Sequence, residues 1–227
     1  MMNKIIHELR HHMPFTFLGA ASGMVFMLIF RNMPREAAHE MFFVFHPLHV
    51  LLSALVTASL FKLHTCPKGG GKRSASPPSA KGEISPSHHQ RWRDGGCNLP
   101  ILLAIGFVGS VGIATLSDSI IPYLGEVLVG MPHSQHHIGF LEKWWLISGV
   151  AVVGIIIAYF NPSTKFPHAG HVLISTWASL FHVLMAKGEN VHFLAYAGIF
   201  VFLFIAVWVP CCVSDIIFPM LFVKDRR

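Results

Sequence analysis

The sequence predicts an all-α integral membrane protein of about six transmembrane helices, arranged as a 3+3 inverted-topology repeat. Three observations predict this fold: the composition, a series of apolar stretches near membrane-spanning length, and two motifs that each occur twice. Of the 227 residues, 53% are hydrophobic and only 12% are charged, whereas soluble domains carry about 25% charged residues. The composition therefore favours a chain whose main partner is the lipid bilayer.

The apolar stretches have the length that a bilayer requires, because a helix crosses the hydrocarbon core in about 20 residues. The first 13 residues are polar, and the apolar run after them lacks a small-residue cleavage site, so we expect a retained helix rather than a signal peptide. The candidate spans are residues 14–30, 46–63, 99–130, 144–160, 168–186 and 192–223.

The basic residues predict the orientation of these spans. The net charge is +6, but Lys and Arg lie mainly in loops beside the spans, so we expect no nucleic-acid partner. Seven of them fall between Lys62 and Arg93, which the positive-inside rule assigns to the cytoplasm. Six crossings then place both termini in the cytoplasm, and we expect a prokaryotic inner or plasma membrane. Arg31 and Arg35 would lie outside, against the rule.

The chain divides into five predicted regions. Residues 67–98 are rich in Gly, Ser, Pro and Lys, a composition that cannot bury enough apolar surface to fold, and we expect a disordered cytoplasmic linker. Residues 1–66 hold a polar N-terminus and two helices, 99–130 the third helix, 131–143 an outer His-rich loop, and 144–227 the second three-helix unit.

An internal repeat predicts the relation between the two units. Residues 46–53 read HPLHVLLS and residues 168–175 read HAGHVLIS, with five of eight positions identical. Residues 117–124 read SDSIIPYL and residues 214–221 read SDIIFPML, again with five of eight identical. Each unit has an odd number of crossings, so the second copy would be inverted, as in many secondary transporters.

Paired histidines in the first motif are candidate metal ligands. His46 and His49, and likewise His168 and His171, are three residues apart, which places both imidazoles of a pair on one helix face. Imidazole is the commonest protein ligand for transition metals. The alternative is that these histidines cap helices or donate hydrogen bonds to carbonyl groups at the membrane interface.

Intramembrane carboxylates mark the second motif. Asp118 and Asp215 each follow a serine, Ser117 or Ser214, and precede a proline by four residues. A carboxylate at membrane depth costs roughly 2.5–3.5 kcal/mol and is a functional candidate. The proline would free the carbonyl of the aspartate itself, which predicts an oxygen-rich cation site in a broken helix. The alternative is a Ser-Asp helix cap.

Histidine and aspartate donors together suit zinc, manganese or ferrous iron, bound as substrate or as ligand. The cysteines Cys211 and Cys212 share a helix face with Asp215, and His182 shares one with His171, although packing is the alternative role for the thiols. The predicted metal ligands are His46, His49, Asp118, His168, His171 and Asp215, and the predicted lining of the transport pathway is Ser117, Ser214, His182, Cys211 and Cys212.

The function predicted from these features is a secondary transporter, or permease, that moves a divalent metal cation, with proton coupling a compatible mechanism. We expect no enzyme: the sequence lacks the Walker A and HExxH motifs. Two alternatives stay open, a membrane-embedded metalloenzyme or haem protein with histidine ligands, and a structural membrane subunit. Six helices are few to enclose a pathway, so a homodimer is expected.

Overall fold

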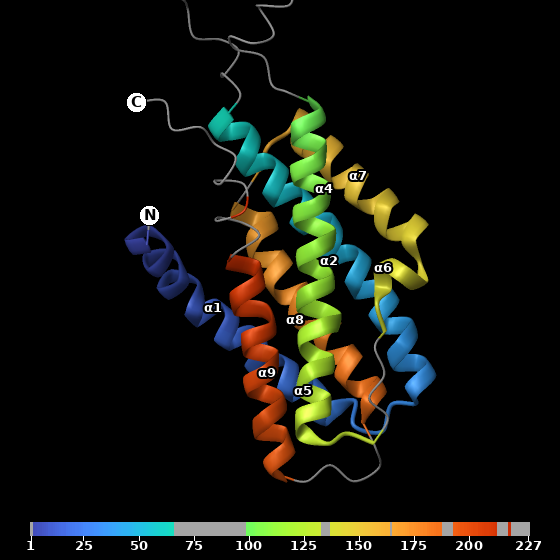
Figure 1. Cartoon of the computed structure of the whole chain (residues 1–227). Coiled ribbons are helices and arrows are strands. Elements are labelled where there is room, and N and C mark those ends of the chain that lie inside the picture. Colours follow the sequence, from blue (N-terminus) through green and yellow to red (C-terminus); the bar gives the residue numbers. More distant parts are fainter. Residues whose placement is uncertain are drawn as a thin grey trace, which may run out of the picture.

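The computed structural model in Figure 1 describes residues 2–65, 99–132, 137–163, 165–187, 193–212 and 218. Within these ranges the side chains of residues 2–12, 15, 64–65, 165–169, 193–194 and 212 are outside the description. The predicted linker and residues 133–136 of the predicted outer loop also lie outside the described residues.

The prediction of an all-α fold is confirmed, because every regular element in the described ranges is a helix. Residues 99–129 form one continuous rod whose middle turn, η1, is π-helical. The elements are α1 (Met2–Ile29), α2 (Arg35–Thr65), α4 (Leu99–Thr115), η1 (Leu116–Ile120), α5 (Ile121–Val129), α6 (Gly139–Glu142), α7 (Trp144–Phe160), α8 (Lys165–Ala186) and α9 (Phe193–Cys212).

Two of these rods, Arg35–Leu63 and Leu99–Val129, are long and apolar enough to cross a membrane by length and composition. The apolar parts of α1, α7, α8 and α9 are shorter. Helices α1 and α2 begin well before the spans predicted at residues 14 and 46, because the polar residues that precede each apolar stretch continue its helix. The number of crossings and the inverted repeat stay predictions.

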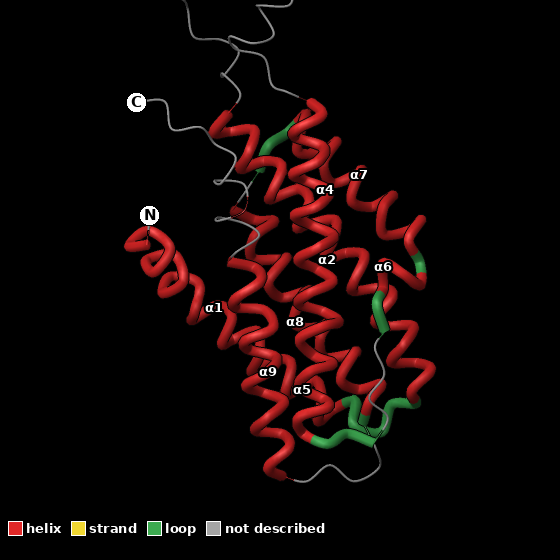
Figure 2. Tube along the Cα trace, in the orientation of Figure 1, coloured by secondary structure: helices red, strands yellow, loops and turns green. Residues whose placement is uncertain are grey.

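Helices α2 and α8 form the centre of the bundle and run antiparallel (Figure 1). The direction follows from their ring contacts: Phe45 stacks on Phe181 at 5.3 Å, and four residues along α2, His49 stacks on His171 at 4.7 Å. Helices α4 and α7 pack on α2, and α1 and α9 pack on the α8 side. Figure 2 shows the α1–α2 connection at one end of the bundle and the green segment that follows α7 at the other.

Buried polar groups lie among the apolar core residues, and large apolar side chains are exposed on the outside of the bundle. The interior carries buried carboxyl, imidazole and hydroxyl groups, including Asp118 and Glu126, residue types that are almost never fully buried unless paired. The outward faces are apolar, and Phe160 at the end of α7 is 78% exposed. Other exposed apolar residues on α7 are Val152, Val153, Ile156 and Ile157.

Close helix packing supports this arrangement where α7 crosses α2. A Cβ atom at Gly154 would lie 2.5 Å from the carbonyl oxygen of Leu51, so only glycine allows the two backbones to approach this far. At the far end of the π-containing rod, Gly130 has φ 74° and ends α5. Its N–H donates to the carbonyls of Glu126 and Val127, an αL ending that favours glycine.

Candidate metal centre

A π turn positions the aspartate of the predicted cation site. In η1 the N–H of Ile121 donates to the carbonyl of Leu116, five residues earlier. The next residue, Pro122, has no N–H to donate to Ser117, and the Ser117 carbonyl instead accepts a hydrogen bond of 3.0 Å from Ser179 Oγ of α8. The helix thus accommodates the proline without a break, in the kind of π segment often found at functional sites.

Asp118 is fully buried and accepts four hydrogen bonds. Its Oδ2 accepts from Nδ1 of His46 at 2.9 Å and from Nδ1 of His49 at 2.7 Å. Its Oδ1 accepts from Ser117 Oγ at 2.6 Å and from Ser175 Oγ at 3.1 Å. Four donors offset the cost of burying a carboxylate. Because the donors come from the α4–α5 rod, α2 and α8, these three elements meet at Asp118.

The HxxH spacing places both imidazoles of α2 on the face that meets Asp118. Because each Nδ1 contacts the carboxylate, each ring presents Nε2 as its remaining nitrogen, and Nε2 of His46 is buried without a hydrogen-bond partner. Histidines that bind metals almost always donate their other ring N–H to a carboxylate, a carbonyl or a water molecule. The geometry therefore favours Asp118 as the residue that orients the histidine ligands, rather than as a direct ligand.

The buried group that could hold a metal ion consists of His49, His171 and Cys211. One ligand atom from each residue lies within 4.8 Å of the other two, and all three residues are buried. The His49 and His171 rings are stacked with an interplanar angle of 23°. Two imidazoles and a thiolate suit zinc and other borderline or soft ions.

The described residues bring together four of the predicted ligands, His46, His49, Asp118 and His171, and the predicted pathway residues Ser117 and Cys211 lie beside them. The side chains of His168 and Cys212, predicted as a ligand and a pathway residue, are outside the described part. Ser214 and Asp215 are entirely outside the described residues.

A second buried polar pair includes a residue that sequence reasoning missed. His182 Nδ1 and Glu126 Oε1 are 2.7 Å apart, and neither residue is more than 1% exposed. The second atoms of the pair, Glu126 Oε2 and His182 Nε2, have no hydrogen-bond partner. The signal was present: Glu126 and Asp118 are the only acidic residues in the apolar stretch 99–130.

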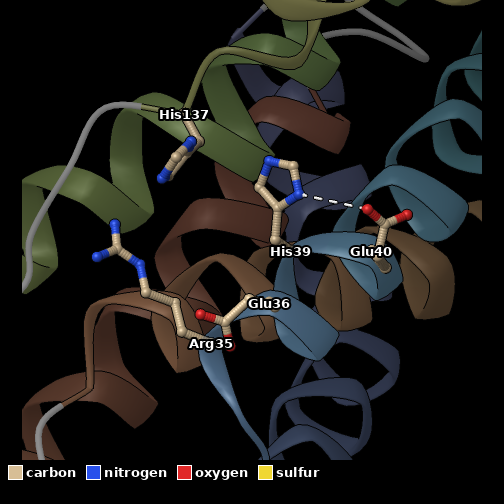
Figure 3. A pocket seen from close by; sticks show the side chains of 5 residues that line it. All are labelled: Arg35, Glu36, His39, Glu40 and His137. Carbon is tan, nitrogen blue, oxygen red and sulfur yellow. Dashed lines mark ion pairs between the residues drawn. The ribbon is translucent and has the colours of Figure 1, made fainter.

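Ring contacts connect this pair with His137 and with the first half of α2. The ring of His182 lies 6.1 Å from that of His137, and 5.6 Å from that of Phe42. Phe42 in turn stacks on His46 at 5.1 Å. Beyond His137 is a pocket of about 360 Å³, drawn in Figure 3, which is lined by Arg35, Glu36, His39, Glu40 and His137. The apolar ring of Phe42 therefore lies between the His182–Glu126 pair and the His46–Asp118 pair.

No protein-family model, curated protein or solved structure significantly matches this chain.

Proposed function

We propose that the protein is a membrane-embedded secondary transporter for a divalent metal cation, with zinc the best match to its ligands. The observation that carries the proposal is the buried group of His49, His171 and Cys211, in which Asp118 accepts a hydrogen bond from His49. Its donor set suits zinc better than manganese, because a thiolate is a soft ligand.

The location in a membrane is supported by the exposed apolar surface of the bundle and its buried ionisable groups. Large exposed apolar side chains cover the outward faces of α1, α4, α7 and α9, among them Leu18, Val108, Phe160 and Val201. Monomeric soluble proteins rarely expose continuous apolar patches of more than a few hundred Å². Lipid contact explains this surface, and it explains why the ionisable groups point inward.

Transport rather than permanent binding is supported by the series of polar clusters. A structural or catalytic metal needs one cluster of ligands. This bundle has further ionisable groups beside the central group: the neighbouring rings of His39 and His137, the pair of His182 with Glu126, and His46 with Asp118. Such residues inside membrane helices mark ion pathways and proton relays. Metal binding would also displace the Cys211 proton, which supports proton coupling.

The inverted repeat is supported by the pairing of α2 with α8. The alignment of residues 46–53 with 168–175 equates His49 with His171 and Ser53 with Ser175. The structure stacks the first of these equivalent pairs on antiparallel helices. Antiparallel packing of equivalent helices across a central site is expected where two units are related by a two-fold axis in the membrane plane.

The test is metal flux into proteoliposomes. Purified full-length protein is reconstituted with an entrapped metal-sensitive dye, and Zn²⁺, Mn²⁺ or Fe²⁺ is added outside, with and without a pH gradient. We expect saturable zinc uptake by wild type and none by the triple variant His49→Ala, His171→Ala, Cys211→Ser. Leu173→Ala, on the exposed side of α8, is the matched control and should transport like wild type.

Two results would overturn the proposal. Protein that binds zinc tightly and shows no flux under any gradient would be a membrane metalloprotein instead. A Soret absorption band in the purified protein would identify the histidines as haem ligands.

A further inference from the structure

We propose that His39, His137 and Glu142 form a second metal site, here called the mouth site, beside the pocket that His39 and His137 line (Figure 3), where a divalent cation binds before it moves inward. The binding site depends only on these three side chains. Its role in loading the central group rests on the proposed function.

The Glu142 carboxylate lies between two imidazoles from different elements. His137 Nδ1 and Glu142 Oε1 are 3.0 Å apart, and His39 Nε2 and Glu142 Oε2 are 3.5 Å apart. His39 is in the second turn of α2, His137 precedes α6, and Glu142 ends α6. One ligand atom from each of the three lies within 4.8 Å of the others, so small side-chain movements would close them around one ion.

The donor types suit a borderline divalent cation. Two imidazoles and one carboxylate are the protein ligands of zinc in several metalloenzymes, where a fourth position is open to water. The pocket of about 360 Å³ beside His39 and His137 has room for such water. Nε2 of His137 is buried and has no hydrogen-bond partner, so the ring can also offer this nitrogen.

Solvent access distinguishes this site from the central one. The side chains of His39, His137 and Glu142 are 31%, 20% and 35% exposed, whereas His49 and His171 are fully buried. A partly exposed site without a thiolate should bind more weakly and exchange its ion faster than the buried group. These properties suit a site that loads a transporter and does not retain the ion.

The surrounding charge also favours a cation. Glu36 and Glu40 line the same pocket, opposed there by Arg35, and Figure 3 shows the His39 ring between Glu40 and His137. With Glu142 beside the pocket, three carboxylates lie near two cations, Arg35 and Lys143, and the Lys143 ammonium lies over the Phe43 ring at 4.1 Å. A cleft of mainly negative charge raises the local concentration of cations.

The position of the site links it to the interior. The His137 ring is 5.5 Å from the His39 ring on the solvent side and 6.1 Å from the His182 ring on the inner side. An ion that leaves this site inward would next meet His182 and Glu126, whose Nε2 and Oε2 atoms have no hydrogen-bond partner.

Cobalt titration of the full-length protein in detergent separates the two sites, because the central site contains the Cys211 thiolate and the mouth site contains no thiolate, so the central site gives a thiolate-to-cobalt charge-transfer band. We expect wild type to bind two Co²⁺ ions, the tighter one with this band. The variant His39→Ala, His137→Ala, Glu142→Gln should bind one ion and keep the band. Cys211→Ser should lose the band and keep the weaker ion. Leu141→Ala, at an exposed position of α6 next to Glu142, is the control and should bind two.

The outcomes distinguish the proposals. If wild type binds only one ion and shows the band, or if the triple variant still binds two, the mouth site is wrong while the central site stands. If wild type binds one ion without the band, and the triple variant of the mouth loses it, the mouth site stands and the central group fails. Unchanged circular dichroism of each variant shows that it is folded.

Discussion

His49 of α2 stacks on His171 of α8, with ring centroids 4.7 Å apart, at positions that are equivalent in the repeated HxxH motif. The two rings project from α2 and α8, which run antiparallel, and Cys211 of α9 is the third member of the group. The two copies of the HxxH motif therefore place equivalent side chains at one point, and the loss of either imidazole removes one ligand of the group.

We predict that His171→Ala abolishes zinc binding at the central group. Asp118 stays bound to His49 in this variant, so the orientation of the remaining imidazole is preserved and only a ligand is lost. The affinity should fall by more than the roughly 10–100-fold that is typical for the loss of a residue behind a ligand. Competition with a chromophoric chelator measures it. An affinity equal to that of the outward-facing Leu173→Ala would show that His171 is not a ligand.

We predict a different result for Asp118→Asn, because Asp118 contacts Nδ1 of both histidines. The amide has the same size but cannot accept from both rings and both serines as the carboxylate does. Metal affinity should fall by about 10–100-fold, while the cobalt charge-transfer band returns at saturating metal. Ser119→Ala is the control, since Ser119 Oγ is buried on the same π turn without a hydrogen-bond partner.

If Asp118 were itself a ligand, the substitution would change the spectrum of the saturated site. That result would restore the direct-ligand role that the sequence predicts for this aspartate.

We predict that Gly139→Ala disturbs the centre through His46. A Cβ atom at position 139 would lie 2.7 Å from His46 Nε2, so the ring would have to move away from its contact with Asp118. Overpacking of this kind costs about 1–3 kcal/mol, and it should lower the thermal unfolding temperature and weaken metal binding together. Gly149→Ala is the control, because a Cβ there meets nothing within 4 Å; it should leave both unchanged or raise stability slightly.

The sequence predicts the helices and part of the site because both depend on local patterns. Apolar stretches predict where α7 and α8 lie, and the spacing of three predicts that His46 and His49 share a face. The role of Asp118 could not be predicted, because it depends on which atoms of α2 and α8 reach the carboxylate across the bundle. The π turn could not be predicted either. Pro122 indicates an interrupted helix, whereas the Ser117 carbonyl accepts its hydrogen bond from Ser179, which is distant in sequence.

The role of Glu126 could also not be predicted from the sequence. The sequence places it in an apolar stretch, as it does Asp118, but no repeated motif marks it. Its partner His182 lies 56 residues away, and only the packing of α5 on α8 joins them. Residues 39, 137 and 142 likewise meet because α6 lies beside the first half of α2, where Glu142 contacts His39 and Gly139 lies against His46.

The Glu126–His182 pair allows stability and transport to be separated. Removal of one member of a buried ionic pair leaves a polar group without its partner, which costs about 3–5 kcal/mol when the pair is charged. Glu126→Leu alone should therefore lower the thermal unfolding temperature strongly. The double variant Glu126→Leu, His182→Phe replaces the pair by apolar side chains, and such replacements are often neutral or stabilising. We expect it to unfold near the wild-type temperature.

The same double variant should nevertheless transport no zinc, because the polar step between His137 and the central group is gone. It should still bind cobalt at Cys211 with the charge-transfer band, since the central ligands are untouched. Proteoliposome flux, thermal unfolding and the cobalt spectrum are measured on one preparation, with the outward-facing Leu173→Ala as the control. Wild-type flux in a stable double variant would mean that the pair serves only packing, and that the ion reaches His49 and His171 by another way.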